Sequence, residues 1–147
     1  MTPQSPPISE RQFELAHEAF RSWTDKLRLA AREVPRLDRP ERMRTVADLV
    51  AFLRHEIAPH MRVDEEVLYP TAAERLGSPL ATAALAYDHI AIRAWIDKLA
   101  EAAGGEDVET LQELLYGLDA LIRVHLWKEH ELTIRPLRSS TWPASGA

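Results

Sequence analysis

Apolar side chains recur at every third or fourth position through most of the chain, which is the spacing of an amphipathic α-helix. Four such stretches are separated by short segments rich in proline, glycine and acidic residues. The first helix is expected to begin at Ser9, with Gln12 completing a capping box. The second begins in "LDRPE", with Asp38 or Arg39 at the cap. The third begins at the serine of "GSPL", and the fourth follows "GGED" and runs to about Pro136.

Short connections between long helices predict antiparallel neighbours, and therefore an all-α, up-down-up-down antiparallel four-helix bundle. The length of 147 residues fits a single domain over residues 1–147. We expect the bundle at about residues 9–137 and a loose tail at 138–147.

Each predicted helix has one inward-facing stripe, which can be followed in alternating steps of three and four residues. The stripes of the first and second helices are Phe13, His17, Phe20, Thr24, Leu27, Ala31 and Val34, and Met43, Val46, Val50, Leu53, Ile57, His60, Asp64, Val67 and Thr71. Those of the third and fourth helices are Leu85, His89, Ile92, Ile96, Leu99 and Ala103, and Leu111, Leu115, Leu118, Ile122, His125, Glu129, Leu132 and Pro136. Every stripe contains one histidine, and two of these histidines are followed one turn later by a carboxylate.

The second helix carries three consecutive acids, Asp64, Glu65 and Glu66, in the stretch "HMRVDEEVLYP". Four residues of an α-helix turn about 400°, so Asp64 lies about 40° around the helix from His60. Glu65 lies about 140° away from His60, and Glu66 lies further still. We therefore expect Asp64 to share the inward face with His60, and Glu65 and Glu66 to be solvated.

The rise per residue tests whether the polar groups of the four stripes meet. At about 1.5 Å per residue, the groups on the first, third and fourth helices lie about 10–16 Å from one end of the bundle. On the second helix, His60 and Asp64 lie about 24 and 18 Å from that end, and His60 is the outlier. Pro59 removes a helical hydrogen bond and is expected to distort the helix just before His60. The six groups are therefore predicted to form one layer.

Six ionisable groups in an apolar core would cost many kcal/mol unless something compensated for their charges. A single histidine on a core stripe is ordinarily a core residue whose ring nitrogens are hydrogen-bonded, but here four of the six histidines lie on stripes. Metal ions compensate best, and because the chain has no cysteine they would be held by nitrogen and oxygen, which suits iron, manganese or zinc. Four imidazoles and two carboxylates suit two metal ions with open positions, whereas a closed structural zinc site would use fewer ligands.

The net charge of −5 provides no basic surface for nucleic acid. No apolar run approaches the roughly 18 residues that span a bilayer, and the first ten residues lack the features of a signal peptide. We therefore expect a cytoplasmic protein that binds neither nucleic acid nor membranes. The sequence leaves the oligomeric state open.

The pattern resembles the hemerythrin-like (HHE cation-binding) domains over about residues 10–137. The resemblance rests on "ELAHEAF", "HMRVDEEVLYP", "DHIAIRAWIDKL" and "HLWKEHELTIRPL", in the order His, His-x3-acid, His, His-x3-Glu. It implies a non-heme centre of two iron ions, bridged by oxo or hydroxo and by two carboxylates, with manganese or zinc as alternatives. The positions that match the family's ligands are His17, His60, Asp64, His89, His125 and Glu129.

Two positions depart from the family. Asp64 stands where a glutamate is usual, and the oxygen carriers have a further histidine at the position of Arg93. With Asp64 shorter by one methylene, Glu65 is the alternative ligand if the helix is distorted near Pro59. A centre with four histidines has more open positions, which favours redox turnover over reversible O2 carriage.

The resemblance implies a di-iron protein that handles O2, hydrogen peroxide or NO by redox chemistry, and a peroxide-decomposing or NO-reacting oxidoreductase is one form that this function can take. A second hypothesis is a module that binds or senses O2 or iron without turnover. The third is a metal-free helical interaction protein, which would leave six inward-facing polar groups to be explained.

Overall fold

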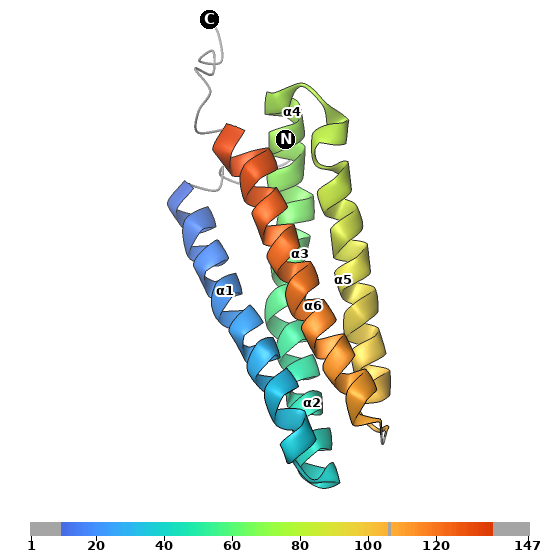
Figure 1. Ribbon diagram of the computed structural model, residues 1–147. Helices are drawn as coiled ribbons and strands as arrows, with labels where there is room; N and C mark the ends of the chain where they lie inside the picture. The colour runs from blue at the N-terminus through green and yellow to red at the C-terminus, as the bar shows by residue number, and fades with distance from the viewer. Residues whose placement is uncertain (1–9, 106, 137–147) are drawn as a thin grey trace, which may run out of the picture.

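The computed structural model describes residues 10–105 and 107–136. Every regular element in these residues is helical, and the helices form long rods that lie side by side in Figure 1. The expected cap at Ser9 and the expected tail at 138–147 lie outside the described residues, as does the side chain of Phe13.

The first and last rods are the simplest, and they pack against each other. The first rod is α1 (Glu10–Glu33), which continues into a 3-10 turn at Val34–Arg36. The last rod is α6 (Val108–Glu129), which continues into a π turn at His130–Ile134. The third rod is α5 (Ala83–Ala102), which packs between α6 and the second rod.

The second rod is divided into three α-helical pieces by two π turns. The pieces are α2 (Arg39–Phe52), α3 (Ala58–Val63) and α4 (Tyr69–Leu76), and the π turns are Leu53–Ile57 and Asp64–Leu68. The rod begins at Asp38, whose carboxylate accepts the N–H of Glu41 at 2.9 Å while Glu41 accepts the N–H of Asp38. This capping box settles the choice between Asp38 and Arg39. The rod ends at Gly77, whose φ of 67° is left-handed.

The start of the third rod differs from the prediction. Ser78 caps a separate 3-10 turn, Pro79–Ala81, by accepting the N–H of Leu80 at 3.2 Å, and α5 begins only at Ala83. The sequence signal at Ser78 was read correctly as a cap, but it caps a short turn and not the long helix.

Each of the three π turns ends two residues before a proline: Pro59, Pro70 and Pro136. In each turn, the residue before the proline donates its N–H to the carbonyl five residues back. Proline in an α-helix lacks an N–H, and its ring collides with the carbonyl four residues back. A π turn adds one residue and moves that carbonyl away, so the second rod continues past Pro59 and Pro70, and the last rod is helical up to Pro136.

The extra residue in a π turn shifts the inward stripe by one position. On the second rod, Leu68 and Tyr69 are buried, whereas the predicted Val67 is only half-buried. On the last rod, Thr133 is fully buried and the predicted Leu132 is 44% exposed. These two predictions were wrong because strict α-helical spacing was assumed. Met43 is also exposed, because it precedes the first buried position of α2 at the end of the bundle.

Many of the other predicted stripe positions are buried in the core, which also contains residues beside the stripes, such as Trp23, Leu49 and Met61. The main cluster contains residues from all four rods, among them Leu27, Val46, Ile96 and Leu118. No helix in the described part of the chain is long and apolar enough to cross a membrane.

Candidate metal centre

Glu129, the last residue of α6, lies at the centre of the predicted layer and is only 2% exposed. One carboxylate oxygen, Oε1, lies 2.9 Å from Nε2 of His17 on α1. The other, Oε2, accepts a hydrogen bond from the Tyr69 hydroxyl at 2.7 Å and lies 3.2 Å from Nε2 of His125. The carboxylate therefore faces two groups of residues, one on each oxygen.

On the Oε2 side, the inward nitrogens of two histidines meet. Nε2 of His89 on α5 lies 3.0 Å from Nε2 of His125 on α6, and the Tyr69 oxygen lies 3.0 Å from the same His89 atom. His89, His125 and Glu129 each offer a ligand atom within 4.8 Å of the others, and all three residues are buried. Among the described residues, this is the group of histidine and carboxylate side chains able to hold a metal ion together.

The outward nitrogens of the same two histidines each contact a carboxylate. Nδ1 of His89 lies 2.8 Å from Oε1 of Glu65, and Nδ1 of His125 lies 3.1 Å from Oδ2 of Asp88. Each carboxylate is held in turn by a cation: Arg93 binds both oxygens of Glu65, at 2.9 and 3.1 Å, and Lys128 binds Oδ1 of Asp88 at 2.8 Å.

These outward contacts fix the tautomer of both histidines. Burial alone would raise the pKa of Glu65 and of Asp88, but hydrogen bonds from Arg93 and His89, and from Lys128 and His125, lower it, so both carboxylates are ionised. An ionised carboxylate only accepts hydrogen bonds, so each Nδ1 carries a proton. In a neutral imidazole the proton on Nδ1 leaves a lone pair on Nε2, and both lone pairs face the centre.

The atoms that face the centre therefore include more hydrogen-bond acceptors than donors. With both imidazoles neutral, two Nε2 lone pairs face each other at 3.0 Å, and the hydroxyl proton of Tyr69 already goes to Glu129. A positive charge among these atoms removes the repulsion. Burial would lower the pKa of His125, but the hydrogen bond and charge of Glu129 outweigh it and raise that pKa, so the centre favours a cation.

Tyr69 was not among the residues predicted from the sequence. Its side chain is buried, and its pKa is raised by burial and by the neighbouring charge of Glu129. It reaches the centre because the π turn before Pro70 rotates the second rod by one position. Pro70 within a helical pattern was the available signal for this shift.

Asp64 and Glu65 occupy different places. Asp64 is half-buried, and burial together with the charges of Glu129 and Glu65 raises the pKa of its carboxyl group to about 9, which keeps it neutral without a compensating cation. Glu65 was expected to be solvated, and this expectation was wrong, because it pairs with His89 and Arg93. The oxygens of Glu65 contact the Nδ1 atom of His89, which faces away from the centre, and the guanidinium of Arg93. Glu66 is exposed, as expected.

His60 lies apart from the hydrogen-bonded cluster. Its imidazole is half-buried and packs edge-on against the rings of Phe20, at 5.2 Å between centroids, and Trp23, at 5.1 Å. Burial lowers its pKa, opposed by the charge of Glu56. Within the described residues it makes no hydrogen bond or ion pair. His60 was also the outlier when the rise per residue was used to align the six predicted ligands. The residue after it, Met61, is the one that is fully buried in the core.

Burial of the central carboxylate is compensated by its neighbours. Burial alone would raise the pKa of Glu129, but hydrogen bonds from His125 and His17 lower it to about 2. An ionised carboxylate with one oxygen toward His17 and the other toward His125 has the arrangement of a ligand that can bridge two cations.

Comparison with known proteins gives one result that covers most of the chain. A family model described as "Hemerythrin HHE cation binding domain" matches residues 10–135. No curated protein and no solved structure matches the chain significantly. The matched range contains the whole helical bundle and the buried cluster of His89, His125 and Glu129. Among the described residues, the buried cluster of His89, His125 and Glu129 could hold such a cation. The chain therefore belongs to the hemerythrin HHE cation-binding domain family, which implies that it binds a cation.

Proposed function

We propose that this centre holds two iron ions and uses them for redox chemistry with O2, hydrogen peroxide or NO. The observation that carries the proposal is the close approach of the Nε2 atoms of His89 and His125, at 3.0 Å, while Glu65 and Asp88 hold the Nδ1 atoms of the same two rings. This arrangement is unfavourable without a cation and suits a metal ion, because outer carboxylates orient metal-binding imidazoles in the same way.

The donor set fits iron. It consists of imidazole nitrogens and carboxylate oxygens, with a phenol oxygen nearby and no thiolate. We assign His89 and His125 to one ion, and His17 and His60 to the other. Glu129 would be shared, since its two oxygens face the two sides, and Asp64 would be the second shared carboxylate. Glu65 is excluded from this role because Arg93 and His89 occupy its oxygens.

Bound iron would supply the electrons and polarise the small ligand. The chain's own residues would shape the site around it. Tyr69 keeps its proton and donates it to Oε2 of Glu129, so it would hold that carboxylate in its orientation. Arg93 has its guanidinium on Glu65 and cannot serve as the additional ligand of an oxygen carrier.

The experiment measures the consumption of hydrogen peroxide and of NO by the iron-loaded protein. His125→Ala removes a proposed ligand, and His55→Ala, at an exposed position on the second rod, is the matched control. We expect turnover by the parent and by His55→Ala, and its loss in His125→Ala. An O2 adduct that forms and releases O2 over repeated cycles, without any turnover of peroxide or NO, would instead assign the centre to binding or sensing.

A further inference from the structure

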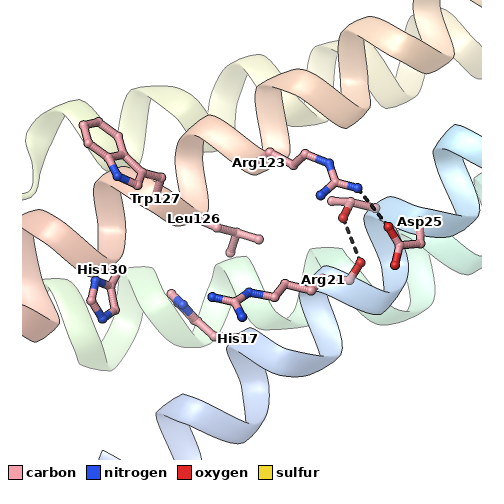
Figure 2. A pocket seen from close by; sticks show the side chains of 8 residues that line it. His17, Arg21, Asp25, Arg123, Leu126, Trp127 and His130 are labelled. Atoms are coloured by element: carbon pink, nitrogen blue, oxygen red, sulfur yellow. Dashed lines mark hydrogen bonds and ion pairs between the residues drawn. The ribbon is translucent and has the colours of Figure 1, made fainter.

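A pocket of about 440 Å³ lies between α1 and the end of the last rod, beside the candidate metal centre. It is lined by His17, Arg21, Thr24, Asp25, Arg123, Leu126, Trp127 and His130. Figure 2 shows the pocket with α1 on one side and α6 on the other. His17 joins the pocket to the centre, since the same imidazole that lines it contacts Glu129.

Among the described residues at the pocket, the charged arginine and aspartate side chains pair with one another except for Arg21. Arg123 binds Asp25 at 2.9 Å and Asp119 at 2.7 Å, and Arg28 binds Asp119 at 3.0 Å, so these two arginines balance these two aspartates. The guanidinium of Arg21 makes no hydrogen bond or ion pair with any described residue, and it points into the pocket toward His17 in Figure 2. An uncompensated guanidinium that faces a cavity is suited to an oxyanion, which it can bind through two parallel N–H donors.

Two of the residues that line the pocket, Leu126 and Trp127 on α6, are apolar. Leu126 lies between Arg21 and Trp127 in Figure 2, and Trp127 is 65% exposed, so its apolar surface is accessible to a ligand in the pocket. A volume of about 440 Å³ is within the range of pockets that take small organic molecules, and it is far larger than an inorganic oxyanion needs. The pocket thus offers a charged anchor and an apolar wall to one ligand.

We propose that this pocket binds a small organic anion, with its carboxylate or phosphate group on Arg21 and its apolar part against Trp127 and Leu126. The bound anion would lie beside His17, on the side of the centre away from His89. Binding requires neither of the proposed iron ions and none of the proposed redox chemistry. Failure of one proposal is therefore distinguishable from failure of the other.

The test titrates the full-length protein, with its natural metal content, against benzoate and phenyl phosphate by calorimetry. Benzamide is the neutral counterpart of benzoate, and inorganic phosphate supplies charge without an apolar part. We expect benzoate or phenyl phosphate to bind, and the tighter of the two identifies the anionic group. Benzamide and inorganic phosphate should each bind at least about tenfold more weakly, because benzamide lacks the charge and inorganic phosphate lacks the apolar part.

Arg21→Gln should weaken binding of the preferred anion about tenfold or more, because it removes the charged donor. Arg32→Gln, at an exposed position on the same helix, should bind like the parent. Equal binding by Arg21→Gln and the parent, or no binding of either aromatic anion by the parent, would overturn the proposal. If Arg21→Gln loses metal, the test uses Trp127→Ala in its place. An affinity of Trp127→Ala for the aromatic anion equal to that of the parent would also overturn the proposal.

Discussion

Asp88 is expected to control metal affinity although it is not a proposed ligand. Its carboxylate accepts from Nδ1 of His125 at 3.1 Å and from Nζ of Lys128 at 2.8 Å. Asp88→Asn keeps the size of the side chain but replaces one acceptor oxygen with an NH2 donor. That donor would face either the ammonium of Lys128 or Nδ1 of His125.

If the new amide donates to Nδ1, the imidazole of His125 must carry its proton on Nε2, and the lone pair that faces the centre is lost. If the amide turns the other way, its NH2 group faces Lys128 and the contact loses its charge. Either way the metal-binding tautomer of His125 is no longer favoured. Loss of an outer contact of this kind lowers metal affinity by about 10- to 100-fold, which corresponds to about 1.4–2.8 kcal/mol.

The assay is competition for Zn²⁺, which has no redox chemistry of its own, between the protein and a chromophoric chelator. The matched control is Asp97→Asn on the same helix, where the carboxylate is 68% exposed and pairs with Arg54 at 3.0 Å. An exposed pair of this type contributes about 0–1 kcal/mol, and it lies away from the centre. A dissociation constant for Asp88→Asn within about threefold of the parent value, with the fold intact by circular dichroism, would refute the tautomer argument.

Four further outcomes are expected. Asp64→Ala should lose at least one metal ion per chain while Glu66→Ala retains all of them, and metal analysis showing the reverse would mean that the wrong acid has been assigned to the centre. Tyr69→Phe should lower the free energy of unfolding by about 1–3 kcal/mol, because Glu129 loses a hydrogen bond to a charged oxygen; a superimposable denaturant curve would contradict this. Gly117→Ala should destabilise the protein by about 1 kcal/mol or more despite its better helix propensity, since the new Cβ would overlap the ring of Trp95; an unchanged or higher melting temperature would count against that packing. Removal of metal by a chelator should lower the melting temperature by several degrees, and identical melts of a verified metal-free sample would argue against a buried site.

The arrangement of the helices was predictable because it depends on local signals. The capping box at Asp38, the left-handed Gly77 and the three-and-four spacing of apolar residues are properties of short segments, and each is found in the structure. The meeting of His17, His89, His125 and Glu129 followed from the rise per residue alone, since α1, α5 and α6 are regular up to these positions.

The second rod could not be predicted at the same level. Its two π turns each add a residue, so the inward positions shift from strict α-helical spacing along this rod, and Tyr69 replaced Val67 as the inward residue. The outer carboxylates were missed for another reason. Asp88 and Glu65 lie beside the inward stripes and not on them, and whether such a residue reaches a histidine depends on the neighbouring helix, which no single stripe describes.

The central claim is that the buried histidine–carboxylate cluster holds a pair of iron ions. The most direct test is elemental analysis of the full-length protein, purified under native conditions, together with the same analysis of a His89→Ala variant. The account predicts about two iron ions per parent chain and at most about one per variant chain. A parent protein that contains no metal, and takes up neither iron, manganese nor zinc on reconstitution, would contradict it.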